Sequence, residues 1–124
     1  MTRAQVTFPD GYSFQVEVAT TQEERSRGLS YRSECGNGML FVFPDDGIVY
    51  RPMWMWRMRF PLDIVWLDAR GMIVDAAMNV PPGPNDGPCL PVVNSMIPAV
   101  RVLELPAGSI VAHGLTVGSI VVIR

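Results

Sequence analysis

The chain has 124 residues, near the commonest domain size, and its 48% hydrophobic and 18% charged residues exclude a disordered chain. The net charge of −2 gives no overall field that would attract nucleic acid or an anionic membrane. All ten basic residues are arginine, which excludes a Schiff-base lysine, a P-loop lysine and a lysine general base.

The sequence leaves the compartment open. No stretch approaches the roughly 18 uninterrupted apolar residues of a membrane span. Residues 1–12 lack a basic start followed by an apolar core, so we expect no signal peptide, although a mature exported form would look the same. Cys35 and Cys89 are not in a C-x-x-C pair, and geometry decides whether they form a disulfide.

The first third of the chain predicts a hairpin, a helix and a central strand. Apolar residues alternate over 6–18 around the turn at 9–11, which indicates a hairpin with one buried face. Thr20 or Thr21, each three residues before a glutamate, can open a capping box. The helix would run to about Arg27 and end with Gly28 in the left-handed conformation. The apolar run 38–43 predicts a central strand, followed by a turn at 44–47.

Residues 48–60 alternate with a period of two, which predicts a strand with an arginine side and an aromatic side. Trp54 should then be buried, as should Trp66 and Phe41, while Arg57 and Arg59 should reach solvent. Pro52 suggests an edge strand or a bulge.

The segment 62–78 predicts a second hairpin around the turn Asp68–Gly71. In the predicted register Leu67 opposes Ile73 and Asp63 opposes Ala77. Residues 80–98 contain six of the eleven prolines, so we expect a mobile surface loop that covers a binding site. A strand at 99–105, a short helix or turn near 107–113 and a strand at 119–123 follow. The predicted fold is a single mainly β domain, a small barrel or sandwich with one or two short helices.

Four short motifs occur in a familiar order: Arg27-Gly28-Leu29, the run 38–43, Trp54-Met55 followed by Pro61-Leu62-Asp63-Ile64, and the segment 102–108. Together they resemble the domain of unknown function 192 (DUF192) family of small bacterial and archaeal proteins, over about residues 14–123. The resemblance implies a compact, mainly β fold with short helices, and many bacterial members carry a secretion signal. The family's biochemical activity is not established.

The sequence departs from the family pattern at three places. The family usually has a basic residue and an asparagine after the Trp-Met pair, where this chain has Trp56 and Arg57. Ser30 stands where methionine is common, and Ser119 replaces the aspartate of a common Gly-Asp pair. If the asparagine contributes to the family's site, that site is altered here.

Asp63 and Glu104 are the carboxylates most embedded in apolar sequence. Asp63 either lies on a half-exposed face or accepts backbone hydrogen bonds at a strand end, or it is buried with Arg27 or Arg101 as its partner. Glu104, between two leucines, should be solvated or paired with an arginine. An enzyme could use Asp63 with Glu104 or Asp75 as an acid–base pair.

Other ligand chemistries have weaker support. His113 is the only histidine, so no zinc spacing exists, and nothing in the sequence joins it to a cysteine nucleophile. Met53, Met55 and Met58 are soft ligands that could bind Cu(I), although methionine also fills cores. The predicted strand places arginines and tryptophans on opposite faces, which argues against a stacking platform for nucleic acid.

The predicted function is a binding or interaction module, with an unknown small-molecule or protein partner. We expect no cofactor, no metal and no nucleic acid, and a monomer or weak homo-oligomer. The carboxylate enzyme is the alternative, and Cu(I) binding is a minor one. The candidate surface joins the arginine side of 48–60, Asp63 and the proline-rich loop. The candidate binding residues are Arg27, Trp54, Met55, Arg57, Asp63, Cys89, Arg101 and Glu104.

Overall fold

The computed structural model describes residues 2–45, 47–84 and 92–124. In chain order its elements are β1 (Thr2–Thr7), β2 (Ser13–Ala19), α1 (Gln22–Arg27), β3 (Met39–Val42), β4 (Met53–Trp54), β5 (Leu62–Leu67), β6 (Ile73–Val80), β7 (Val92–Val93), β8 (Arg101–Pro106), α2 (Ser109–Ala112) and β9 (Val122–Ile123). Neither of these helices is long and apolar enough to cross a membrane.

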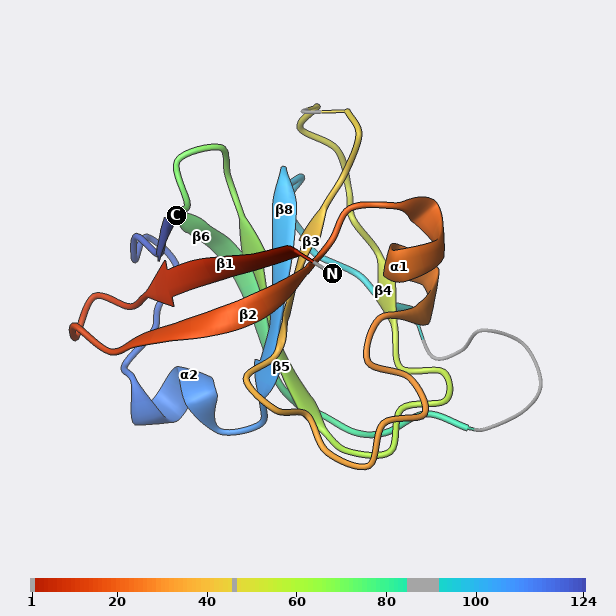
Figure 1. Cartoon of the computed structure of the whole chain (residues 1–124). Helices are drawn as coiled ribbons and strands as arrows, with labels where there is room; N and C mark the ends of the chain where they lie inside the picture. The colour runs from red at the N-terminus through yellow and green to blue at the C-terminus, as the bar shows by residue number, and fades with distance from the viewer. Residues whose placement is uncertain (1, 46, 85–91) are drawn as a thin grey trace.

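Most of these strands form one curled sheet. In the described part of the chain a seven-stranded sheet has the order β6-β5-β8-β3-β2-β1-β9, and β4 pairs separately with β7. The β1–β2 hairpin crosses steeply in front of β3, β8 and β5, so the sheet curls like half of a barrel (Figure 1). The predicted mainly β fold with two short helices is therefore confirmed.

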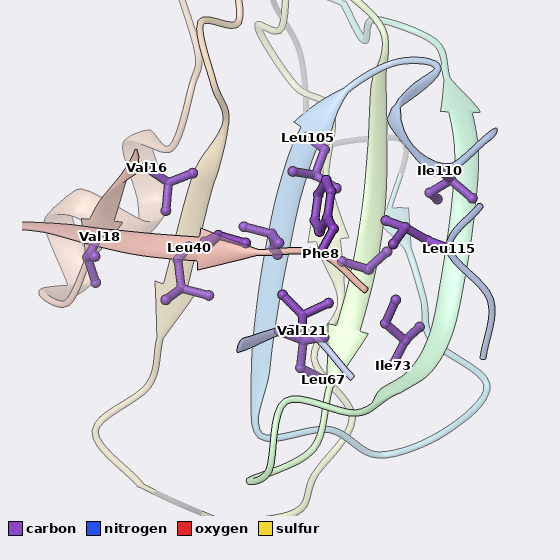
Figure 2. Packing of buried hydrophobic residues seen from close by; sticks show 13 residues of the cluster. Phe8, Val16, Val18, Leu40, Leu67, Ile73, Leu105, Ile110, Leu115 and Val121 are labelled. Atoms are coloured by element: carbon purple, nitrogen blue, oxygen red, sulfur yellow. The ribbon is translucent and has the colours of Figure 1, made fainter. Parts of the chain in front are cut away.

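The sheet is apolar on both faces, and each face has its own core. The first core, shown in Figure 2, consists of Val6, Phe8, Val16, Val18, Leu40, Val65, Leu67, Ile73, Leu103, Leu105, Ile110, Leu115 and Val121. The second core consists of Ala19, Leu29, Met39, Phe41, Met53, Met55, Met58, Leu62, Ile64, Trp66, Val80, Ala99 and Val102. Every residue of β5 is buried because its alternating side chains enter the two cores in turn.

Helix α1 connects two parallel strands, β2 and β3. Parallel neighbours need a crossover connection, which takes the chain over one face of the sheet. The predicted capping box is present: the Glu24 amide donates to the Thr21 hydroxyl, and the Glu24 carboxylate accepts from the Thr21 amide. Gly28 ends the helix as predicted, but with φ 50° and ψ −130°, outside the left-handed helical region.

The β5–β6 hairpin has the predicted turn and only part of the predicted register. The Gly71 amide donates to the Asp68 carbonyl, and Leu67 pairs with Ile73 as expected. A β-bulge at the next pair shifts the ladder by one residue, so Ala77 pairs with Ile64 and not with Asp63.

The predicted strand over 48–60 is wrong. Only Met53–Trp54 is a strand, and the chain turns directly after it, where Arg57 has φ 62° and the Met58 amide donates to the Met55 carbonyl. The expected faces are also exchanged, since Trp54 is 36% exposed whereas Met53 and Met55 are buried. The methionines pack in the second core, and the side chain of Trp54, which alternates with them, therefore points outward. Trp66 and Phe41 are buried as predicted.

The proline-rich segment lies partly outside the described residues. Strand β6 extends to Val80, and the Gly83 amide donates to the Met55 carbonyl. Residues 85–91, with Cys89, are not among the described residues, so a mobile loop over the site stays a prediction. After this segment, β8 and α2 correspond to the predicted strand and short helix, and the final strand is shorter than expected.

Candidate functional site

A pocket of about 200 Å³ opens on the second-core side of the sheet. It lies between α1, the end of β3, β4 and β8, and α1 and β4 share one flank of the molecule (Figure 1). Its apolar walls come from Leu29, Phe41, Phe43, Met53 and Met58. Because a cavity of about 150 Å³ holds benzene, this pocket has room for a molecule built on a single ring.

Glu104 forms the floor of this pocket. Strand β8 lies between β3 and β5, where Glu104 pairs with Met39 on one side and Ile64 on the other. Leu103 and Leu105 enter the first core, so the side chain of Glu104 between them faces the second core and the pocket. Glu104 is 3% exposed.

The Glu104 carboxyl group faces the pocket and has no partner among the described residues. No described residue donates a hydrogen bond to it or pairs with it as an ion, so the predicted solvated or arginine-paired glutamate is wrong. Burial alone raises the pKa of Glu104 from 4.5 to about 8. At neutral pH the floor of the pocket is therefore mostly a protonated carboxyl group, which can both donate and accept a hydrogen bond.

The loop before β3 closes tightly on Glu104. A side chain at Gly38 would place its Cβ 2.1 Å from the Glu104 carbonyl oxygen, so only glycine fits there. Cys35 in the same loop is a half-buried free thiol. Burial, followed by the charge of Glu104, raises the pKa of Cys35 to about 12. The thiol is thus protonated at neutral pH and unreactive as a nucleophile.

Two arginines from the last turn of α1 lie at the mouth. The Arg25 guanidinium donates to the carbonyls of Thr20 and Val42, at 2.6 and 3.1 Å, and lies 5.5 Å from the centre of the Phe43 ring. Arg27 is exposed, and the described part of the chain offers its guanidinium no hydrogen-bond or ion-pair acceptor. Trp54 completes the rim.

Asp63 has a structural role on the opposite face. It is 1% exposed, and its carboxylate accepts hydrogen bonds from the backbone amides of Asn79, Gly108 and Ile110, at 2.9, 3.1 and 2.9 Å. This matches the predicted backbone acceptor at a strand end, and the alternative pairing with an arginine is wrong. Because Ile64 shares a face with Glu104, its neighbour Asp63 points to the other side of the sheet.

Asp75 binds yet another segment. Its carboxylate accepts from the Ser95 hydroxyl at 3.1 Å and the Met96 amide at 2.6 Å. The structure therefore does not bring Asp63 together with either Glu104 or Asp75 as an acid–base pair.

The remaining predicted binding residues lie away from the pocket. Met55 is fully buried in the second core, and Arg101 is on the same side of β8 as Leu103, opposite Glu104. Cys89 lies outside the described residues. Arg57 stacks on the Trp56 ring, 3.7 Å from its centre. Arginine and aromatic side chains thus share a surface here, and the argument from opposite faces against nucleic acid is wrong.

The structure supports no metal centre among the residues that it describes. Within residues 2–45, 47–84 and 92–124, no group of three histidine, cysteine, aspartate or glutamate side chains could hold an ion. His113 Nδ1 lies 2.8 Å from an Asp10 carboxylate oxygen, and this pair joins the β1–β2 turn to α2. Of the three methionines considered for Cu(I), Met53 and Met58 line the pocket and Met55 does not.

Of the binding residues predicted from the sequence, Arg27, Trp54 and Glu104 line this pocket. Four further lining residues, Arg25, Phe41, Met53 and Met58, were not predicted to belong to the site. One signal was available. Residues 102–105 are Val-Leu-Glu-Leu, in which apolar and polar residues do not alternate. Such a nearly continuous apolar run is typical of a strand that is buried on both faces. A glutamate in such a strand has no solvated side to occupy.

Comparison with known proteins gives a family and two similar structures. The chain matches the model of the DUF192 family, described as "Uncharacterized ACR", over residues 5–123. A crystal structure of a candidate transcription regulator from Sinorhizobium meliloti is 27% identical, with a TM-score of 0.78, and the match covers 98% of this chain and 92% of that one. A protein of unknown function from Novosphingobium aromaticivorans is also 27% identical, with a TM-score of 0.80, covering 98% of this chain and 84% of that one.

No curated protein matches the chain. The family match spans essentially the whole chain and confirms the resemblance seen in the four sequence motifs. The chain belongs to the DUF192 family.

Proposed function

We propose that this protein is a binding module that takes a small organic molecule into the Glu104 pocket. The observation that carries this proposal is a carboxyl group, 3% exposed and without a partner among the described residues, that faces an open apolar pocket. A buried polar group without a hydrogen bond is costly, and a ligand that bonds to it removes that cost. Mostly apolar walls with one convergent polar group are typical of small-molecule sites.

Binding has better support than catalysis. The raised pKa of Glu104 would suit a general acid or base. However, none of the described residues that line the pocket is a second carboxylate, a histidine or a cysteine. A lone protonated carboxyl group can orient a ligand through a hydrogen bond without any further catalytic group.

The test is a binding experiment on the full chain by two-dimensional NMR, with phenol, indole and benzamide as probes. At least one probe should shift amide signals in 25–29, 39–43 and 102–105, the segments around the pocket. Trp54→Ala should weaken that binding because Trp54 forms the rim. Tyr50→Ala is the matched control, since Tyr50 is an exposed aromatic residue outside the lining. The proposal would be refuted if all pocket amides stayed unshifted with these three probes and with the four benzyl and benzoate probes described below.

The similarity to a candidate transcription regulator makes DNA a second partner to test. Arg57 stacks on Trp56 and lies 5.1 Å from the centre of the Tyr31 ring, an arrangement that can stack on bases. Against DNA, the net charge is −2, and the described helices of six and four residues are short for reading a major groove. We therefore expect no salt-sensitive binding of duplex or single-stranded DNA in a fluorescence anisotropy titration.

A further inference from the structure

We propose that the pocket selects small organic acids whose anionic group pairs with Arg27 at the mouth and whose hydroxyl or carbonyl oxygen hydrogen-bonds to Glu104 at the floor. This inference rests on the proposed function and names the chemical class of its ligand. It follows from three observations: the charge of the mouth, the character of the walls and the state of the floor.

The mouth is positively charged. Arg25 and Arg27 both line it, and Glu104 is the only acidic residue among the described lining residues. Arg25 is held in place by two backbone carbonyls, whereas the Arg27 guanidinium has no acceptor in the described part of the chain. Helix α1 has two acidic residues. Glu24 is occupied by the backbone amides of Thr20 and Thr21, and Glu23, four residues before Arg27, forms no ion pair with it in the described part of the chain. A guanidinium without a partner binds a carboxylate through two parallel hydrogen bonds.

The walls between mouth and floor are mostly apolar, although Gln22 and Ser26 of α1 also line the pocket. Phe41 is 2% exposed and Met58 is 5% exposed, and Met53 lies beside them. This passage favours a ring or short hydrocarbon body that separates the two polar ends of the ligand. A fully polar anion such as phosphate would lose its hydration against these apolar walls without gaining hydrogen bonds from them.

The floor is compatible with an acid because it is uncharged at neutral pH. The strands beside Glu104 present Met39 and Ile64, which do not titrate. The Cys35 thiol is protonated at neutral pH, because burial raises its pKa to about 12. Glu104 is thus the group whose titration changes the floor, and its ionised form would repel an anionic ligand and could no longer donate a hydrogen bond.

Binding should therefore depend on the protonated fraction of Glu104. With a pKa of about 8, the protonated fraction falls about tenfold between pH 7 and pH 9. The affinity for an acid should fall by about the same factor if the ionised form does not bind. An amine would behave in the opposite way, because it would pair with the ionised carboxylate and bind more tightly as the pH rises.

The experiment uses calorimetric titration of the full chain with 4-(hydroxymethyl)benzoate, a probe with both ends and no group that titrates between pH 6.5 and 9.5. Benzoate lacks the hydroxyl group, benzyl alcohol lacks the carboxylate, and benzylamine carries the opposite charge. The two-ended acid should bind most tightly, and its affinity should fall about tenfold from pH 7 to pH 9. Two-dimensional NMR at pH 7 shows whether each probe reaches the pocket amides.

Two variants separate the ends of the pocket. Arg27→Gln should weaken the acid about tenfold and keep the pH dependence, whereas Arg70→Gln, an exposed arginine outside the lining, should change nothing. Glu104→Gln should still bind the acid but lose the pH dependence, because glutamine is neutral at every pH and both donates and accepts. Arg27→Gln replaces an exposed side chain, so it tests the proposal even if Glu104→Gln is poorly folded.

Each contrary result has a distinct meaning. Tighter binding of benzylamine or benzyl alcohol than of the acid would overturn this inference and leave the binding pocket standing. Equal affinity of the Arg27→Gln and Arg70→Gln proteins would remove the role of Arg27. An unchanged pH dependence in Glu104→Gln would remove the role of Glu104. If none of the four probes, and none of phenol, indole and benzamide, shifted a pocket amide, the proposed function would fall with it.

Discussion

Replacement of Glu104 by glutamine should stabilise the protein at neutral and alkaline pH. The wild-type side chain is buried with no partner among the described residues, and burial raises the pKa of Glu104 to about 8. In the unfolded chain the same group titrates near its ordinary value of 4.5. Glutamine has nearly the same shape and no proton to lose, so it removes the pH-dependent cost and leaves the packing unchanged.

The sign follows from proton binding in the two states. Between pH 4.5 and pH 8 the folded protein keeps the Glu104 proton and the unfolded chain releases it, so rising pH favours unfolding. The loss is about 1.4 kcal/mol for each pH unit, because one unit of pKa corresponds to that free energy. It reaches about 3 kcal/mol at pH 7 and about 5 kcal/mol above pH 8, where it stops growing. These are large fractions of the roughly 5–15 kcal/mol by which a domain of ordinary stability resists unfolding.

The assay is urea denaturation of both proteins at pH 5, 6, 7, 8 and 9. The difference in free energy of unfolding between Glu104→Gln and wild type isolates this group, since all other titrating groups are shared. The difference should rise with pH and become constant above pH 8. Glu23→Gln changes an exposed glutamate on α1 and serves as the matched control, with the pH profile of the wild type. A constant difference between Glu104→Gln and wild type from pH 5 to pH 9 would refute the buried, protonated carboxyl group.

Three further substitutions test the framework of the site. Asp63→Ala leaves three backbone amides without their acceptor, a buried one at Ile110 and two part-buried ones at Asn79 and Gly108, and should destabilise by about 2–3 kcal/mol. Asp63→Asn keeps one acceptor oxygen and should cost less, and equal urea midpoints for Asp63→Ala and wild type would contradict this role. Gly38→Ala should destabilise by at least about 2 kcal/mol more than Gly36→Ala. Both glycines have positive φ, but only Gly38 approaches the β8 backbone, and equal losses would show that the contact relaxes. Thr21→Ala removes the cap of α1 and should lower the free energy of unfolding by about 1 kcal/mol, so an unchanged thermal midpoint would argue against the capping box.

The sequence determined the features that depend on neighbouring residues. The hairpin turn at 9–11, the Thr21 cap with Glu24, and the turn from Asp68 to Gly71 all form as predicted. Each needs only residues within about four positions, whose side chains and backbone preferences are readable locally. The mainly β fold followed from the same alternation and turn signals, and the four motifs identified the family.

Tertiary structure decided which side chains are inside, and with them the site. The alternation over 48–60 contained two possible faces, and the second core selected the methionines over Trp54. Glu104 is buried because β3 and β5 flank its strand and α1 crosses over the same face, contacts that join residues far apart in the sequence. The residues next to Glu104 in the sequence do not predict that both faces of the sheet are covered. The pocket, the partnerless carboxyl group and its raised pKa therefore exist only once these distant segments pack together.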